Sequence, residues 1–147
     1  MSERVFLDTN ILIYADDLDA GAKRERAQNL LRAHITSATA VFSTQVLQEF
    51  FAVATRKLGV LPEVARRKIE LLARAEIVVV RADTIFAAID LHRLHSLSFW
   101  DALIVTAAIA SGCQRVLTED MAHGTTIQGV RIENPFLEAA ARSPTEA

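Results

Sequence analysis

Four carboxylates in this chain lie just after, or early within, apolar segments, where a buried acid needs a partner. They are Asp8 in VFLDTNILIYA, Glu49 in FSTQVLQEFFAVATRK, Asp101 in SFWDALIVTAA and Asp120 in VLTED. Burying a lone carboxylate is costly, and several converging carboxylates repel one another and take up protons at neutral pH. A divalent cation removes that penalty, and oxygen ligands suit Mg²⁺ or Mn²⁺. These residue types therefore predict an oxygen-lined metal site, whose natural chemistry is hydrolysis of a phosphodiester.

Each acid also has an ordinary structural explanation. Asp101 stands three residues after Ser98, which is the spacing of a helix capping box. Glu49 fits the polar stripe of an amphipathic helix, and Asp120 fits a turn beside a solvated Glu119. These explanations weaken when the acids are taken together, because all four occupy comparable surroundings in one chain.

Asp8 is the hardest of the four to explain by structure alone. It interrupts an apolar stretch, and Thr9 and Asn10 add polar groups beside it. A carboxylate at such a position must meet a hydrogen-bond donor, a cation or water. Asn10 has a separate explanation, as the cap of a short helix from Ile11 to Ala15.

The strands and helices that must position these acids are predicted to alternate along the chain. Short β-branched or aromatic runs predict five strands, at residues 5–7, 40–42, 77–80, 116–117 and 130–132. Helical periodicity predicts helices at 22–33, at 45–57, from Pro62 onward, at 83–95 and at 99–111. This alternation predicts an α/β fold, a three-layer sandwich around a mainly parallel sheet of about five strands. The working site of such a sheet lies beyond the carboxyl ends of its strands, so the four acids are expected to meet there.

The bulk composition predicts one globular domain over residues 1–147, with residues 143–147 frayed. Apolar residues make up 51% of the chain, yet no apolar run is long enough to cross a membrane. The single cysteine, Cys113, favours a reducing cytoplasm, and the scattered histidines show no zinc spacing.

A net charge of −2 argues against binding nucleic acid by bulk electrostatics. Local basic contacts remain open, with Arg56 and Lys57 as the first candidates because they close the helix that carries Glu49.

Four segments together resemble the PIN-domain ribonucleases, most closely the VapC-type toxins of bacterial toxin–antitoxin pairs. The segments are FLDTNILIYA, STQVLQEFFAVATRK, SFWDALIVTAA and VLTEDMAHGTTIQGVRIENPF, in order from Val5 to Phe136. The resemblance implies a PIN-like fold whose acidic metal-site residues are Asp8, Glu49, Asp101 and Asp120. It also implies supporting polar side chains, namely Thr9, Asn10, Ser43 or Thr44, and Thr118. Glu119 is either an outer-sphere helper or uninvolved, and His123-Gly124 resembles a structural turn.

The resemblance further implies an Mg²⁺- or Mn²⁺-dependent endoribonuclease that leaves a 5′-phosphate and a 3′-hydroxyl. It implies a homodimer and a cognate antitoxin, a segment of which blocks the acidic cleft, often with a basic side chain. We expect Asp8, Asp101 and Asp120 to hold one or two ions, and Glu49 to bind directly or through water. A metal-bound water would then attack the RNA phosphate in line and displace the 3′ oxygen.

Two other functions remain open. The first is a catalytically silent PIN-like module whose acidic cleft only binds a partner. The second is a phosphoaspartate phosphatase or receiver, which also places an aspartate after the first strand. The phosphatase needs a second aspartate where this chain has Asn10, and the receiver needs a late lysine, whereas no lysine follows Lys68. Both phosphoaspartate classes are therefore disfavoured.

Overall fold

The computed structural model describes residues 3–137, which fold around one six-stranded sheet of order β3-β2-β1-β4-β6-β5. The frayed end predicted for residues 143–147 lies outside the described residues. The strands are β1 Val5–Leu7, β2 Ala40–Ser43, β3 Glu76–Val78, β4 Arg115–Leu117, β5 Thr126–Ile127 and β6 Val130–Glu133. The neighbouring strands in the series β3-β2-β1-β4-β6 all pair in parallel. The edge strand β5 runs antiparallel to its neighbour β6. The predicted mainly parallel sheet is confirmed, with one more strand than expected.

The additional strand is a two-residue edge strand, too short to show any alternation of apolar and polar residues. It is joined to β6 by Gln128 and Gly129, which both have positive φ angles, of 47° and 85°. Two such residues are what a tight hairpin turn between antiparallel strands requires. The hairpin therefore depends on local turn geometry, and the sequence has no apolar run there that would predict a strand.

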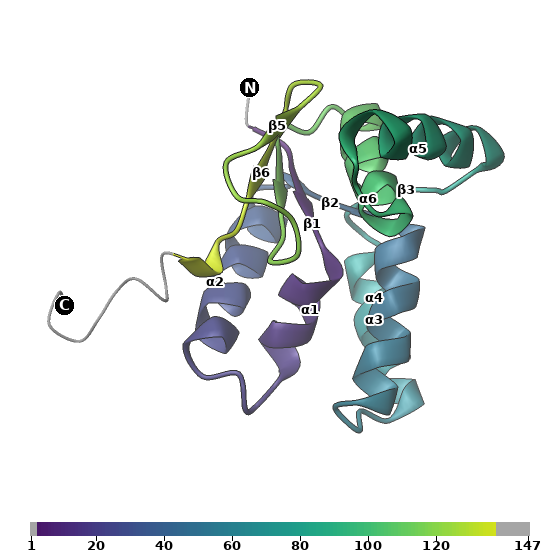
Figure 1. Cartoon of the computed structure of the whole chain (residues 1–147). Helices are drawn as coiled ribbons and strands as arrows, with labels where there is room; N and C mark the ends of the chain where they lie inside the picture. Colours follow the sequence, from purple (N-terminus) through teal and green to yellow (C-terminus); the bar gives the residue numbers. More distant parts are fainter. Residues whose placement is uncertain (1–2, 138–147) are drawn as a thin grey trace, which may run out of the picture.

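Six helices flank the sheet (Figure 1). They are α1 Thr9–Asp16, α2 Ala22–Thr36, α3 Thr44–Arg56, α4 Pro62–Leu72, α5 Ala82–His95 and α6 Phe99–Ala110. Pro62 occupies the first turn of α4 as predicted, because its missing N–H costs nothing there. Helix α6 is buried at every residue from Ala102 to Ala108 and packs against β2, β4 and β6, while α5 covers it. No helix in the described part of the chain is long and apolar enough to span a membrane.

The central strands are apolar on both faces, as expected for a parallel sheet covered by helices. Val5, Phe6 and Leu7 of β1 have no exposed surface, and β2 is buried along its whole length. Because β1 lies between β2 and β4, the carboxyl ends of these three parallel strands lie side by side. The residues that leave those ends are therefore brought together from three distant parts of the sequence.

The first strand passes directly into a helix at Asp8. The Asp8 backbone is extended, with φ −76° and ψ 166°, and its Oδ1 accepts a hydrogen bond from the Thr9 N–H at 2.7 Å. Asp8 is thus the N-cap of α1, and the prediction that Asn10 caps a helix beginning at Ile11 is wrong. Because the chain enters the helix one residue after the strand, Asn10 lies in the first turn and its amide is free to bond elsewhere.

Candidate functional site

Asp8 is the most deeply buried of the four acids, with only 6% of its surface exposed. Besides the Thr9 N–H, its carboxylate accepts a hydrogen bond from the Thr118 hydroxyl, at 2.7 Å to Oδ2. Burial raises the pKa of Asp8 to about 6, although both hydrogen bonds act to lower it. The negative charges of Asp120 and Glu49 raise this pKa further. Asp8 is therefore an acid that a nearby cation would stabilise strongly in its charged form.

Thr118 is the hydrogen-bonding centre of this edge of the sheet. It follows β4, has no exposed surface, and donates its hydroxyl proton to Asp8. The same oxygen lies 3.3 Å from the side-chain nitrogen of Asn10 and 3.1 Å from the backbone nitrogen of Asp120, and both donate to it. One hydroxyl has a single proton and two lone pairs, so Thr118 is fully used. It joins the first strand, the first helix and the loop after β4.

We expect Thr118→Val to destabilise the protein by about 1–3 kcal/mol, because it strips the hydrogen bond from a buried carboxylate and from two donors at once. Loss of that bond raises the Asp8 pKa further, so the destabilisation should be larger at pH 7 than at pH 5. Urea unfolding in EDTA at both pH values measures it. Thr118→Ser, which keeps the hydroxyl, is the control; equal stability of the Val and Ser variants would remove Thr118 from this role.

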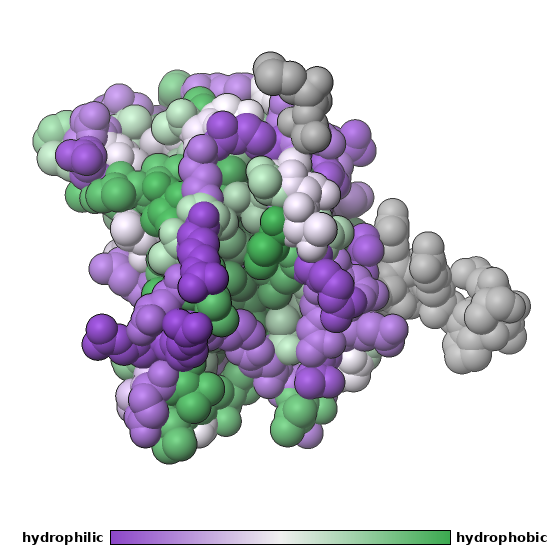
Figure 2. Space-filling model, turned by 180° about the vertical axis from the view of Figure 1, so that it is seen from behind, coloured by the Kyte–Doolittle hydropathy of each residue, from purple (hydrophilic) through white to green (hydrophobic). Residues whose placement is uncertain are grey.

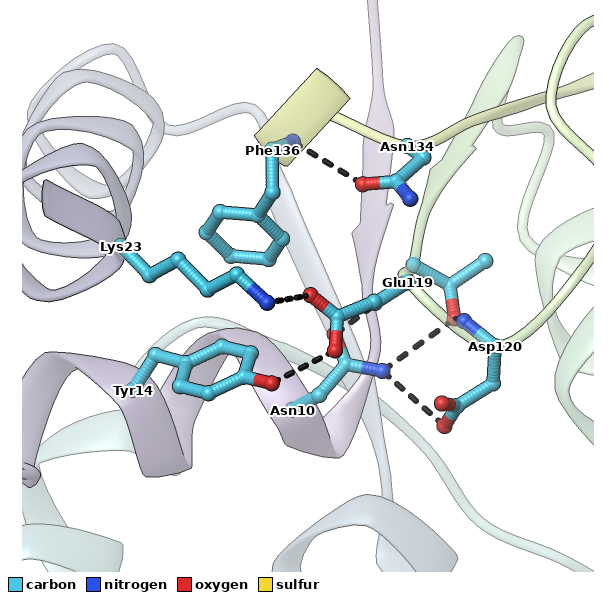
Figure 3. A network of polar contacts seen from close by, with 8 residues as sticks. Asn10, Tyr14, Lys23, Glu119, Asp120, Asn134 and Phe136 are labelled. Atoms are coloured by element: carbon cyan, nitrogen blue, oxygen red, sulfur yellow. Dashed lines mark hydrogen bonds and ion pairs between the residues drawn. The ribbon is translucent and has the colours of Figure 1, made fainter. Parts of the chain in front are cut away.

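Asp120 and Glu119 are adjacent in sequence but make different contacts (Figure 3). The Asp120 carboxylate is exposed at the edge and accepts a hydrogen bond from the Asn10 amide at 3.1 Å. Glu119 instead accepts bonds from the Tyr14 hydroxyl at 2.5 Å and from the Lys23 ammonium at 2.7 Å. Burial acts to raise the pKa of Glu119, yet these two donors hold it below its ordinary value.

The group around Glu119 continues into the apolar core. The rings of Tyr14 and Phe136 meet edge to face with centroids 5.1 Å apart, and the Lys23 ammonium lies 5.0 Å from the centre of the Tyr14 ring. Asn10 joins this group to Asp120, since its side-chain oxygen accepts from the Glu119 backbone N–H at 3.4 Å. Glu119 thus anchors the loop after β4 onto α1, while Asp120 is left at the edge.

Glu49 and Asp101 complete the set from two other helices. Burial raises the pKa of Glu49, and the charges of Asp120 and Asp101 raise it further, while the nearby polar side chains of Gln45 and Thr9 act to lower it. Burial also raises the pKa of Asp101, and the charge of Asp120 adds to that shift. The negative charge of Asp120 therefore acts on each of the other three acids.

The capping-box explanation of Asp101 holds only in part, because no hydrogen bond from the Ser98 backbone N–H to its carboxylate is found. Its backbone N–H donates to the Ser98 hydroxyl at 3.1 Å, so Ser98 is the N-cap of α6 as the spacing predicts. This bond uses the backbone of Asp101, and the Ser98 side chain also acts to lower the Asp101 pKa. The cap therefore fixes the first turn of α6, which in turn orients the carboxylate of Asp101.

The donor set of the four acids suits a hard cation, since every candidate ligand atom is a carboxylate oxygen. In the part of the chain that the structure describes, however, no three Asp, Glu, His or Cys side chains are grouped tightly enough to enclose a metal ion. Repulsion between like charges favours such separation where no cation offsets it. The acids therefore fit a metal by the chemistry of their ligand atoms, while their present spacing does not form a ready-made site.

The other predicted supporting residues occupy more ordinary positions. Ser43 is fully buried and caps α3, with its hydroxyl accepting from the Val46 N–H at 3.3 Å. The Thr44 hydroxyl accepts from the Val80 N–H at 3.1 Å and so ties the segment after β3 to the start of α3. Both residues fix where α3 begins, and thereby where Glu49 lies.

The remaining predicted residues lie further from the acids. Arg56 and Lys57 are exposed at the end of α3, about 10 Å along the helix axis from Glu49. His123 accepts a hydrogen bond on Nδ1 from the Asn134 backbone N–H at 3.0 Å, which ties its loop to the end of β6. The contact agrees with the structural role expected for this turn.

Two residues of this region were missed by sequence reasoning. Trp100 has no role among the residues predicted from the sequence, yet 63% of its surface is exposed. It lines a cavity of about 290 Å³ together with Gln45, Gln48 and Glu49. Gln45 is only 7% exposed and donates from Nε2 to the Trp100 carbonyl at 3.3 Å. The available signal was the position of Trp100 directly before Asp101, at the open end of a buried helix.

A family model for the PIN domain matches residues 5–123, and the chain therefore belongs to the PIN domain family, a family of nucleases. The match spans the segments that carry all four acids. Strands β5 and β6 lie beyond it and extend the sheet from β4. No curated protein matches the chain significantly in sequence.

Solved structures of bacterial toxins share this fold. The VapC20 toxin of Mycobacterium tuberculosis, which cleaves the sarcin–ricin loop, is 23% identical with a TM-score of 0.64, over 79% of this chain and 91% of that one. A toxin–antitoxin complex from Klebsiella pneumoniae is also 23% identical with a TM-score of 0.64, over 89% and 97%. VapBC2 of Rickettsia felis, bound to a fragment of its promoter DNA, is 25% identical with a TM-score of 0.63, over 88% and 97%.

Proposed function

We propose that this chain is a metal-dependent endoribonuclease and the toxin of a toxin–antitoxin pair. The observation that carries the proposal is the mutual electrostatic action of four carboxylates, Asp8, Glu49, Asp101 and Asp120, that come from four separate segments. Membership of the PIN domain family and the fold shared with VapC proteins support the same reading. The charge on these acids suits a cation-dependent step on a phosphate better than direct binding of an anion.

Asp8, Asp101 and Asp120 are the residues that would hold Mg²⁺ or Mn²⁺, with Glu49 binding directly or through water. When bound, such an ion supplies an activated water and offsets the charge that develops on the phosphate. Thr118 orients the Asp8 carboxylate, and each Asp8 oxygen keeps a second lone pair for a ligand. Asn10 holds one oxygen of Asp120 through its side-chain amide. These contacts fix the carboxylates in position before the substrate arrives.

The decisive experiment is incubation of the purified chain with total RNA, with Mg²⁺, with Mn²⁺ and with EDTA, followed by mapping of new 5′ ends. We expect discrete cleavage sites in either cation and none in EDTA, with products that carry a 5′-phosphate. Cleavage that persists unchanged in EDTA would exclude the metal-dependent mechanism. No cleavage of any RNA in either cation would exclude the nuclease.

One observation favours a second candidate, the catalytically silent PIN-like module. No ready-made group of three metal-binding side chains occurs among residues 3–137. Calorimetric titration with Mn²⁺ separates the two functions. An active nuclease binds the ion at millimolar concentrations or below, and Asp8→Asn weakens that binding. A wild-type chain that binds no divalent ion in this range is the silent module.

A toxin of this kind would bind two protein partners, a cognate antitoxin that inhibits it and a second copy of the chain. A groove of about 610 Å³ runs between α2 and α4, and Figure 2 shows this hollow with its apolar lining. Ile35 and Leu71 line it and remain half exposed, which suits an apolar antitoxin segment. A shallower cavity of about 520 Å³ between α3 and α4, lined by Phe51 and Ile69, suits contact with a second copy. The free, buried Cys113 is compatible with the reducing cytoplasm in which such pairs would act.

A further inference from the structure

The only tryptophan of the chain lies exposed beside the acids. Trp100 is in the first turn of α6, whose following residues are buried, yet 63% of its own surface is open to solvent. Large aromatic side chains gain more than most others from leaving water, so exposing one at this edge forgoes stability. Because Trp100 directly precedes the candidate catalytic residue Asp101, a ligand that binds at the acids could also cover this exposed ring.

The indole is held in place from two sides. The Phe99 ring meets it edge to face, with centroids 5.2 Å apart and planes at 70°, and Phe99 itself packs against the core. The Trp100 carbonyl accepts the hydrogen bond from Gln45, which is almost fully buried in α3. Because the side chain and the backbone are both fixed, a ligand that stacks on this ring orders little new structure.

The cavity beside the indole has the chemistry of a nucleobase site. Its lining combines the aromatic face of Trp100, the side-chain amides of Gln45 and Gln48, and the carboxylate of Glu49. A flat neutral ring with hydrogen-bonding edges can stack on the indole and bond to the exposed amide of Gln48. A phosphate is disfavoured at the same spot because Glu49 carries like charge. The base would thus enter this cavity while its phosphate lies toward the cation that the other acids would hold.

We propose that Trp100 is the stacking platform for one unpaired nucleobase next to the scissile phosphate. The proposal rests on the proposed nuclease function, because it places the base relative to that reaction. A base in a continuous duplex is stacked on its neighbours and cannot present its face to the indole. Trp100 then determines which RNA structures bind, and its neighbour Asp101 contributes to the chemistry.

The test measures RNA binding in EDTA, where no cleavage interferes. The probes are a mixed-sequence single-stranded 12-mer RNA and a blunt duplex of the same sequence, titrated at low salt. Because Trp100 is the only tryptophan, its fluorescence reports directly on stacking. We expect the single strand to quench this fluorescence and the duplex to leave it unchanged. Absence of quenching by the single strand up to millimolar concentration overturns the proposal.

Variants followed by fluorescence anisotropy of labelled RNA give the second measurement. Trp100→Ala should weaken single-strand binding by roughly 5- to 150-fold, the usual loss for one stacked base, and leave duplex binding unchanged. Trp100→Phe keeps an aromatic face and should recover most of that loss. Phe86→Ala is the matched control, because Phe86 is 66% exposed on α5 and lines none of the cavities described above. Equal losses in Trp100→Ala and Phe86→Ala would overturn the proposal.

The remaining outcomes separate this inference from the proposed function. If wild type cleaves RNA and Trp100→Ala binds and cleaves single strands as well as wild type does, the stacking platform is wrong and the nuclease stands. If single-stranded RNA quenches Trp100 but no divalent ion supports cleavage, the base site is supported and the nuclease is wrong. If Trp100→Ala changes the oligomeric state in light scattering without changing RNA affinity, Trp100 belongs to an interface between copies, which overturns the proposal.

Discussion

Asp8→Asn is expected to abolish metal-dependent RNA cleavage, with a loss of at least about 1000-fold, and to make the protein more stable at neutral pH. The loss follows because a missing ligand removes several kcal/mol of charge stabilisation from a step on phosphate. The gain in stability follows from the burial that raises the Asp8 pKa to about 6 from its usual 3.8. Removing that buried charge is expected to stabilise the fold by about 1–3 kcal/mol at pH 7.

The sign of the pH dependence distinguishes this effect from a general one. Between pH 4 and 6 the folded protein holds the Asp8 proton more tightly than the unfolded chain does, so wild type loses stability as the pH rises through this window. Asp8→Asn lacks this loss. Urea unfolding in EDTA at pH 4, 5, 6 and 7 measures it, with Asp90→Asn, an exposed aspartate on α5, as control. An Asp8→Asn variant that cleaves RNA at the wild-type rate would remove Asp8 from the chemistry.

Asp120→Asn and Glu119→Gln, two neighbouring substitutions that each remove one negative charge, should differ by at least about 100-fold in RNA cleavage. The charge of Asp120 acts on all three of the other acids, so its loss should cost about 1000-fold. Glu119 is held by Tyr14 and Lys23, so its loss should leave cleavage within about tenfold of wild type. Its cost in stability is expected to stay within about 1 kcal/mol, because the ion pair with Lys23 is partly exposed.

A second measurement on the Asp120→Asn and Glu119→Gln variants does not depend on RNA cleavage. Without the Asp120 charge, the pKa values of Asp8, Glu49 and Asp101 should all fall, which carboxyl NMR titration in EDTA can follow residue by residue. Glu119→Gln should leave these three pKa values close to those of wild type. If the two substitutions reduce cleavage equally, the assignment of Asp120 over Glu119 is wrong.

The sequence was sufficient to predict the main frame of this fold and the candidate acids. Strands β1, β2 and β4 are continuous apolar runs because both faces of the sheet are covered, and such runs are visible without coordinates. Since parallel strands end at one edge, the acids that follow them could be predicted to be neighbours. Charge coupling among the four acids agrees with that expectation, while their role as metal ligands stays a prediction.

The features of the site that could not be predicted from the sequence depend on contacts between distant segments. Nothing local distinguishes Glu119 from Asp120, and only the positions of Tyr14 and Lys23 on α1 and α2 decide which carboxylate turns away. Trp100 stands at the start of a strongly apolar helix, and nothing in that apolar run shows that its own side chain is 63% exposed. Gln45 reads as an ordinary polar helix residue until α6 is placed beside it.

The place of β4 beside β1 has a consequence for how this protein is made. Asn10 and Asp120 are hydrogen-bonded across 110 residues of sequence, and the intervening chain must leave the ribosome before they can meet. A nascent or truncated chain that stops short of Asp120 carries Asp8 without its neighbour and has no assembled acid set. The order of synthesis therefore delays assembly of the acid set until the segment through Asp120 has been translated.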